Sequence, residues 1–233
     1  MSVDFSVDLI SDLNLSESDV FTWTEKASSL FCIVAGNVSD DLGVLERTLD
    51  HLSDCYHGVF FIDGSLEHLN LEDYETRTAE IKKVCDSLNN VVYLHNHIVI
   101  LNNIAFVGSN GWYGNRRSRN SVDDEDYIVG YRTADIAYLS NSIKRLQYNA
   151  EVKRIILVTN SMPSKKIAFN SPLVDLPSEL HPTLSLIFDE VHKVSKWLFG
   201  TSDISVDVTI GNIKYVNNPR DPNLIYWPKR IEV

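Results

Sequence analysis

The chain has 233 residues, of which 44% are hydrophobic and 23% are charged, and its formal net charge is -11. These proportions are those of an ordinary globular protein with a sizeable core. The acidic balance argues against broad electrostatic binding to DNA or RNA, which needs clustered Lys and Arg. No apolar run approaches the roughly 18 residues of a membrane helix. We therefore expect protein or small-molecule partners and no membrane association.

The three cysteines, Cys32, Cys55 and Cys85, form no Cys-x-x-Cys pair. An odd number of cysteines in apolar surroundings favours buried free thiols over disulfides or a metal cluster. Residues 1–4 show no basic segment followed by a long apolar one, so no signal peptide is evident. These features favour the cytoplasm or another reducing intracellular compartment.

Short apolar runs predict strands along most of the chain. They are Val7–Ile10, Leu30–Ala35, Val59–Ile62, Val91–Leu94, Ile98–Leu101, Ile104–Val107, Arg154–Thr159, Trp197–Phe199, Val206–Ile210 and Ile213–Val216. The pairs Asn102-Asn103 and Gly211-Asn212 predict tight hairpin turns.

A period of 3.6 residues in the apolar positions predicts helices. The stripes run over residues 42–52, 74–88 and 136–146, with a fourth helix expected over Leu184–Val194. The polar stretch Gly114–Asp126 is expected to be a solvated loop. Early strand–helix alternation implies parallel strands and the late hairpins imply antiparallel ones, so we expect one α/β domain over residues 1–233.

Polar motifs follow several of the predicted strands in a recognisable order. They are Asp12-Leu13-Asn14 with a helix expected after it, Gly36-Asn37, Asp63-Gly64-Ser65-Leu66-Glu67, Asn160, and Gly200-Thr201-Ser202-Asp203. With the segments Ile98–Tyr113 and Asn218-Pro219-Arg220, this order resembles the calcineurin-like metallophosphoesterase family over nearly the whole chain. The resemblance implies a four-layer αββα sandwich of two mixed β-sheets flanked by helices.

Members of that family hold two divalent metals at strand ends through the pattern Asp-x-His, Gly-Asp, Gly-Asn-His-Asp/Glu, His and Gly-His-x-His. Carried over, the resemblance implies that Asp12 keeps its carboxylate. The final pair of histidines is replaced by Thr201 and Asp203. The remaining ligand and proton-donor positions hold Asn14, Asn37, Ser65, Leu66 and Asn160. Only Asp12 and Asp203 would still ligate strongly.

Two of these replacements matter most for the chemistry. Asn37 stands where the family has the bridging carboxylate, and a neutral amide cannot offset the repulsion of two cations. Leu66 stands where the resemblance implies the proton donor, and it transfers no proton at any pH. The sequence therefore predicts a site with no metal, no cofactor and no catalytic residue.

The leading hypothesis is a catalytically inactive metallophosphoesterase-like protein, a pseudoenzyme that acts as a structural or protein-interaction module. A viral or phage assembly is one setting compatible with it, and so is a viral particle. The alternative is a residual metal-dependent phosphoesterase with a site rebuilt around Asp12 and Asp203. A third reading is a metal-free phosphate binder that uses Arg116, Arg117 and Arg119.

Several residues also have simpler interpretations. Asn14, Asn37 and Asn160 are residue types that stabilise turns. His68 could replace a lost ligand, but a single surface histidine is the favoured interpretation. His95 and His97 could form a weak metal signal, but two histidines on one solvated or hydrogen-bonded strand face are favoured.

The stretch Trp112–Tyr131 interrupts the regular pattern and is long for a plain connection. We expect it to contact a second copy or another protein. The candidates are Trp112, Tyr113, Arg116, Arg117, Arg119, Tyr127 and Tyr131, with Tyr226-Trp227 as a further aromatic pair.

Overall fold

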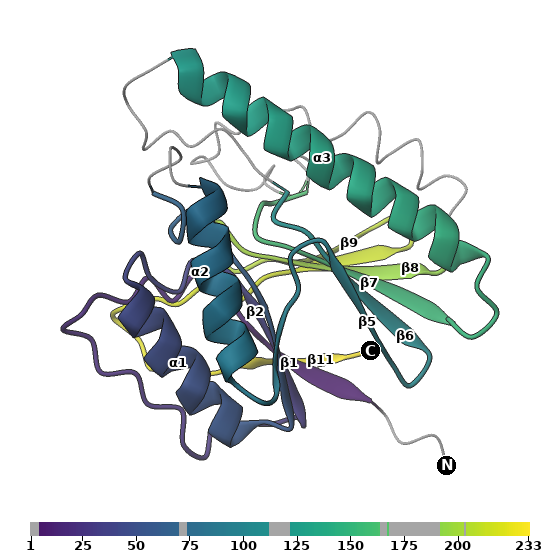
Figure 1. The fold of residues 1–233 in the computed structure, drawn as a ribbon. Helices are drawn as coiled ribbons and strands as arrows, with labels where there is room; N and C mark the ends of the chain where they lie inside the picture. Colours follow the sequence, from purple (N-terminus) through teal and green to yellow (C-terminus); the bar gives the residue numbers. More distant parts are fainter. Residues whose placement is uncertain (1–4, 70–73, 112–121, 164–166, 168–191, 203) are drawn as a thin grey trace.

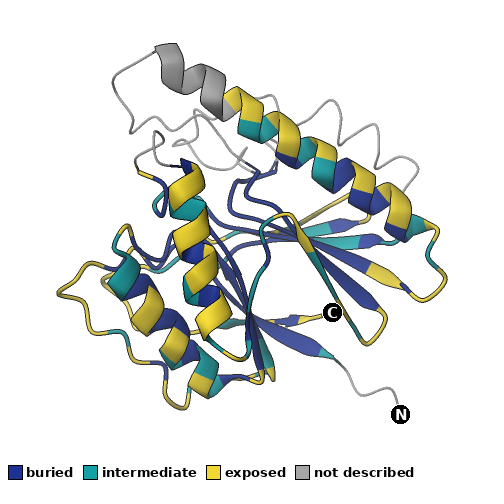
Figure 2. Ribbon diagram, in the orientation of Figure 1, coloured by how far each residue is buried: buried dark blue, intermediate teal, exposed yellow. Residues whose placement is uncertain are grey.

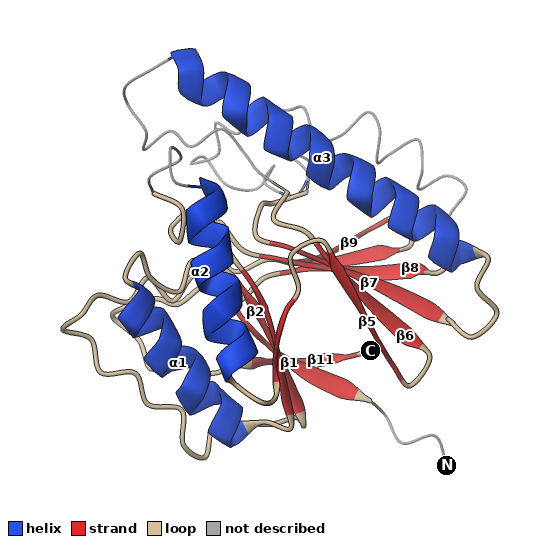
Figure 3. Ribbon diagram, in the orientation of Figure 1, coloured by secondary structure: helices blue, strands red, loops and turns tan. Residues whose placement is uncertain are grey.

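Two β-sheets stacked face to face form the centre of the molecule, and helices cover the outer face of each (Figures 1 and 3). The computed structural model describes residues 5–69, 74–111, 122–163, 167, 192–202 and 204–233, with only the backbone described over 122–128. The four-layer αββα sandwich expected from the sequence is confirmed.

The first sheet has the strand order β11-β1-β2-β3-β4. Its strands are β1 (Ser6–Ile10), β2 (Phe31–Ala35), β3 (Gly58–Ile62), β4 (Val91–Tyr93) and β11 (Lys229–Glu232). Strands β1 to β4 are parallel, whereas β11 pairs antiparallel with β1. The first sheet is therefore mixed, as the sequence predicts.

The second sheet has the strand order β5-β6-β7-β8-β10-β9. Its strands are β5 (His97–Leu101), β6 (Ile104–Gly108), β7 (Arg154–Thr159), β8 (Val194–Phe199), β9 (Asp207–Ile210) and β10 (Ile213–Val216). Strands β6, β7, β8 and β10 are parallel, and the hairpins β5–β6 and β9–β10 add an antiparallel strand at each edge.

Helices α1 (Leu42–Cys55) and α2 (Tyr74–Ser87) pack on the first sheet, and α3 (Val122–Gln147) runs along the second (Figure 1). Three apolar cores result. One lies under α1 and α2, one under α3 around Trp197, and one between the sheets around Phe106. The inner strands β1, β2, β3, β6 and β7 are accordingly buried over nearly their whole length, whereas the edge strands β5 and β9 are partly exposed (Figure 2). This burial explains why the inner strands read as nearly continuous apolar runs.

The Asn102-Asn103 turn is confirmed. Both residues adopt left-handed backbone angles, with φ of 50° and 65°, as a two-residue hairpin turn requires. Gly211, with φ of 61°, opens the corresponding turn between β9 and β10. Cys32 and Cys85 are buried and Cys55 is partly buried, and all three thiols are free.

Four expectations about the secondary structure need correction. No helix follows Asp12-Leu13-Asn14, because the described segment 13–30 is loop and turn anchored by buried Trp23. Val194 begins β8, and the remainder of the fourth predicted helix lies outside the described residues. Residues 122–126 belong to α3 rather than to a loop. Strand β11 was not predicted, because Ile231 is its one apolar residue.

In the part of the chain that the structure describes, no helix has the length and apolar character needed to cross a bilayer.

Candidate functional site

The motifs singled out in the sequence meet at one edge of the two sheets. Asp12 follows β1, Asn37 follows β2, and Ser65 and Leu66 follow β3 in the first sheet. Asn160 follows β7 and Thr201 follows β8 in the second sheet. Because these strands are parallel within each sheet, their carboxyl ends gather at the same edge, where ligand sites of α/β proteins lie.

The Asp12 carboxylate is the centre of this group. It is 3% exposed, and its Oδ1 accepts hydrogen bonds of 2.8 Å from Asn37 Nδ2 and 2.8 Å from the backbone N–H of Thr201. Its Oδ2 is buried and has no hydrogen-bond partner. Burial raises the pKa of Asp12 to about 7, although the Asn37 and Thr201 donors favour the ionised form.

Asn37 is oriented from both ends of its side-chain amide. Its Oδ1 accepts the backbone N–H of Leu66 at 3.0 Å and lies 3.5 Å from Ser65 Oγ. Its Nδ2 therefore faces Asp12 as a donor. Asn37 joins the end of β2 to the ends of β1 and β3.

Asn160 joins the second sheet to the first. Its Nδ2 donates to the carbonyl of Ala35 at 3.0 Å, and its Oδ1 accepts from Thr201 Oγ1 at 2.7 Å and from the backbone N–H of Ser65 at 3.3 Å. A Cβ added at Gly64 would lie 2.4 Å from Asn37 Oδ1 and 2.7 Å from Asn160 Nδ2. The two amides thus pack directly on the backbone of the turn after β3.

Asn14 belongs to the same corner but faces solvent. Its backbone N–H donates to the carbonyl of Asn37 at 2.9 Å, and its side chain donates to the carbonyl of Asp12. Asp12, Asn14, Asn37 and Thr201 all have positive φ, between 48° and 56°. Such angles are uncommon outside Gly and favour Asn and Asp. Asn14 and Asn37 therefore serve the turns, as their residue type suggests, and also lie at the strand-end site. Asp203 lies outside the described residues.

The geometry tests whether the two cations implied by the family resemblance would fit. A bridging ligand must offer lone pairs to both metals, but Asn37 offers N–H groups toward Asp12. The oxygens of Asn37 and Asn160 are already occupied by N–H and O–H donors. Among the described residues, no group of three or more His, Cys, Asp or Glu side chains is placed to hold a metal ion. The side chains that the structure describes do not fit a two-metal centre.

Glu67 fixes the loop after β3, a role that the sequence analysis did not assign. Its buried carboxylate accepts the backbone N–H groups of Gly64, Asn37, Val38 and Ser39 at 2.6, 3.0, 2.5 and 3.3 Å. Burial nevertheless raises the pKa of Glu67. The carboxylate thus holds the turns after β2 and β3 in a fixed relation.

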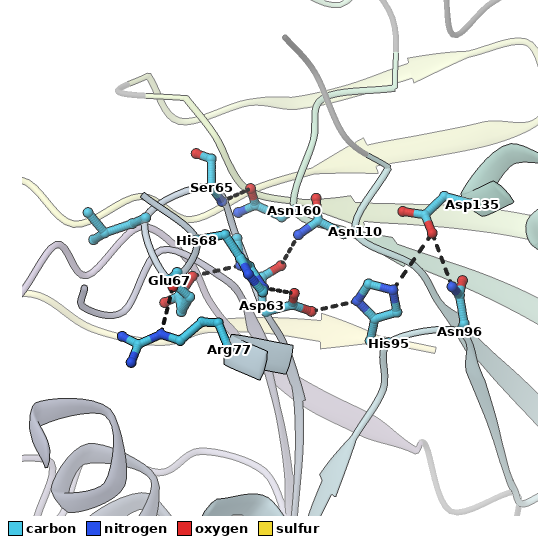
Figure 4. Close-up of polar contacts among 12 residues, drawn as sticks. Asp63, Ser65, Glu67, His68, Arg77, His95, Asn96, Asn110, Asp135 and Asn160 are labelled. Carbon is cyan, nitrogen blue, oxygen red and sulfur yellow. Dashed lines mark hydrogen bonds and ion pairs between the residues drawn. The ribbon is translucent and has the colours of Figure 1, made fainter. Parts of the chain in front are cut away.

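His68 is not a surface residue, contrary to the sequence-based expectation. Its side chain is fully buried, with Nε2 2.6 Å from Asp63 Oδ2 (Figure 4). The other oxygen of Asp63 binds His95 Nδ1 at 2.8 Å, and His95 Nε2 lies 3.7 Å from Asp135 on α3. His95 and His97 do not share a strand face, because His95 lies in the turn before β5 with its side chain 10% exposed, whereas His97 is in β5 and exposed.

The charges of this cluster support one another. Burial alone would raise the pKa of Asp63, but His95 and His68 hold it well below its usual range. Burial alone would lower the pKa of His95, but Asp63 and then Asp135 raise it to about 9. His95 is therefore an imidazolium at neutral pH, held between a strand end of the first sheet and helix α3.

Further polar contacts extend the cluster to β6. Asn96 Nδ2 donates to Asp135 at 3.1 Å and its Oδ1 accepts from Ser109 Oγ. Asn110 Nδ2 donates to the carbonyl of Asp63 at 2.8 Å (Figure 4). The closely spaced histidines were the only sequence signal for this cluster. The cluster itself could not be predicted, because the spacing of Asp63 and His68 matches no helix or strand period.

The expected interface stretch is described in part. Trp112, Tyr113, Arg116, Arg117 and Arg119 lie outside the described residues, and Tyr127 lies in α3 where only the backbone is described. Tyr131 is half-buried, with its ring 3.9 Å from that of Tyr74 on α2. This contact joins α3 to α2, and the interface role of the stretch stays a prediction.

Comparison with known proteins supports the fold and leaves the activity open. The chain superimposes on the crystal structure of phosphopantetheinyl hydrolase (PptH) from Mycobacterium tuberculosis with a TM-score of 0.62. The match covers 99% of this chain and 97% of that one at 13% identity. The chain has the α/β sandwich fold of that hydrolase, and at this identity the likeness shows the fold alone.

A relative is also found by sequence. Over 144 residues the chain is 22% identical to Uncharacterized protein L509 of Acanthamoeba polyphaga mimivirus. The match covers 51% of this chain and 50% of the viral protein, so it spans about half the length of each. No protein-family model matches the chain.

The burial of Asp12 predicts an unusual pH dependence. The pKa of Asp12 is about 7 in the folded state and 3.8 as the reference for the unfolded chain. Between pH 3.8 and pH 7 the folded state therefore binds more protons than the unfolded state. The free energy of unfolding should fall by a few kcal/mol as the pH rises from about 4 to 7. Asp12→Asn should flatten this slope in urea unfolding at pH 5 and pH 8. The exposed Asp50→Asn serves as control, and an equal slope in Asp12→Asn and the parent would contradict the prediction.

His95 predicts a second change at higher pH. Its folded pKa of about 9 exceeds the reference 6.5, so its contribution is fully present below pH 6.5 and lost as the pH rises through 9. His95→Asn should cost about 3–5 kcal/mol at pH 6, because it removes one partner of a buried ion pair. Chemical denaturation at pH 6 and pH 9.5 measures this. The exposed His97→Asn should behave like the parent, and equal stability of the two variants would refute the assignment.

Proposed function

We propose that this chain is a catalytically inactive metallophosphoesterase-like protein that acts as a structural or protein-interaction module. The observation that carries the proposal is the hydrogen bond from Asn37 Nδ2 to Asp12 Oδ1, at 2.8 Å. It sets a donor where two cations would require a shared anionic acceptor. Its orientation is supported by the Leu66 N–H on the other end of the amide.

The absence of a proton donor at position 66 supports the same proposal. The half-buried Leu66 stands where the family resemblance implies the acid that protonates the leaving group. Hydrolysis of a phosphoester needs both an activated water and stabilisation of the leaving oxygen. The described residues at the strand ends supply amide, hydroxyl and backbone donors, in place of groups that would activate the water and stabilise the leaving oxygen.

The setting that we propose is a viral assembly, in which the scaffold contributes shape and surface. The similarity to a mimivirus protein supports a viral origin. The fold shared with a hydrolase explains why the strand ends converge without requiring that the activity is kept.

One observation favours the alternative of a residual site. Asp12 Oδ2 is a buried carboxylate oxygen without a hydrogen-bond partner. A single Mg²⁺ held by one or two carboxylates and water is the arrangement that Asp12 and Asp203 could provide. Titration with Mg²⁺ and Mn²⁺ decides between the two proposals.

The first test measures metal binding and hydrolysis. Elemental analysis should find no stoichiometric divalent metal, and EDTA should leave the melting temperature unchanged, because no metal stabilises the folded state. Phosphomonoester, phosphodiester and phosphopantetheinyl substrates should hydrolyse at the background rate with Mn²⁺ added. Two bound ions, micromolar Mn²⁺ affinity, or turnover lost in Asp12→Ala would overturn the proposal in favour of a rebuilt site.

The second test restores the lost charge. Asn37→Asp would place two buried carboxylates at hydrogen-bond distance, so it should lower the melting temperature by several degrees at pH 8. Added Mn²⁺ should recover part of that loss in Asn37→Asp and leave the parent unchanged. Asn37→Leu, which keeps the branching of the side chain but has no polar atoms, should be destabilised without any response to Mn²⁺. A Mn²⁺ response in the parent equal to that of Asn37→Asp would show that Asn37 does not exclude the metal.

A further inference from the structure

Strand β11 stands at the end of the first sheet, and among the described residues no strand pairs with its other backbone edge. It pairs with β1 on one side, in the register Val7–Ile231 and Leu9–Lys229 (Figure 1). The backbone N–H of Val233 donates to the carbonyl of Phe5 at 2.9 Å. In an antiparallel ladder the hydrogen-bonded positions alternate. Residues 229, 231 and 233 therefore bond toward β1, and the N–H and C=O groups of Arg230 and Glu232 point away from it.

The side chains on this edge carry opposite charges two positions apart. Arg230 and Glu232 are 50% and 64% exposed and lie on the same face of the strand, with Arg230 Nε 3.1 Å from Glu232 Oε1. Ile231 between them points into the core between the sheets. An antiparallel copy of this strand would set each charge opposite its complement.

We propose that a second copy of this chain pairs with β11 across a two-fold axis, with Ile231 opposite Ile231. In this register Arg230 of each copy lies opposite Glu232 of the other. Arg230 and Glu232 are also the residues whose backbone N–H and C=O groups point away from β1. Backbone hydrogen bonding and charge pairing therefore select the same register. The pairing would extend the first sheet continuously through the dimer. It deepens the proposed interaction role by naming a surface and a partner.

Exposed apolar side chains next to the strand could supply the area that a short ladder lacks. Leu224, Ile225 and Trp227 directly precede β11 and are 69%, 79% and 57% exposed. On its other side, Lys229 bonds Asp207 of β9 at 3.2 Å, which places the β9 edge of the second sheet beside β11.

Charges on an edge strand commonly prevent pairing. That protection works when like charges meet, as in an edge bearing several lysines. On β11 the two exposed charges have opposite signs, and the two-fold register turns them into two attractive cross-strand pairs. Opposite charges facing each other across two antiparallel strands stabilise the pairing, and like charges at the same positions destabilise it.

A charge exchange tests the register. The parent should sediment as a dimer of twice 26.4 kDa in analytical ultracentrifugation. Arg230→Glu and Glu232→Arg should each raise the dimer dissociation constant about tenfold or more, because two attractive pairs become two repulsive ones. The double variant should recover the parent's affinity. An equimolar mixture of the two single variants should form a heterodimer, since each then meets its complement.

Controls separate a change in pairing from a change in folding. Each single variant loses the exposed contact between Arg230 and Glu232 within the strand, so its melting temperature should fall only slightly, and the double variant should melt near the parent. Lys144→Glu, an exposed charge reversal on α3, should leave the dimer intact. A monomeric parent would overturn the proposal. A dimer that ignores the single variants, or is not recovered by the double variant, would also overturn it. None of these outcomes alters the metal and hydrolysis results, so the proposed function stands or falls separately.

Discussion

The hydrogen bond between Asn37 and Asp12 is the contact on which the rest of the site depends. Parallel strands of both sheets end at one place and bring their terminal polar groups together there. In a two-metal hydrolase the cations neutralise such a cluster of acidic ligands. In this chain the buried Asp12 carboxylate accepts hydrogen bonds from one amide and one backbone N–H. These donors favour the ionised form, but burial outweighs them and raises the pKa of Asp12 to about 7.

Two further buried carboxylates support this centre in different ways. Glu67 takes four backbone N–H groups and fixes the turns after β2 and β3. Asp63 takes two imidazoles and, through His95, joins the first sheet to α3. Each satisfies the rule that a buried charge must be paired or hydrogen-bonded. The strand-end residues around Asp12 are therefore held by two further buried carboxylates, one of which, Glu67, also binds the backbone N–H of Asn37.

The sequence predicted the elements of the fold that have a periodic or local sequence pattern. Apolar runs located most strands, and Asn102-Asn103 located its hairpin, because burial and left-handed turn geometry leave local signals. The residues of the cleft could be found because each directly follows a strand. Three features left no such signal. Asp63 and His68 meet through a turn, and Trp23 anchors a segment without periodicity. Strand β11 has one apolar residue, so it can be identified only from its pairing with β1.

The hydrogen bonds among the strand-end residues bear on where this fold can bind a partner. In the described structure, the polar groups at the strand ends are largely bonded to one another, so few of them remain for a ligand beyond Asp12 Oδ2. Unused hydrogen-bonding capacity lies instead along sheet edges, and backbone groups there bind another strand without any metal. A scaffold whose strand ends are internally satisfied is suited to bind through its edges. The complementary charges of Arg230 and Glu232 on β11 give one edge the specificity that such binding requires.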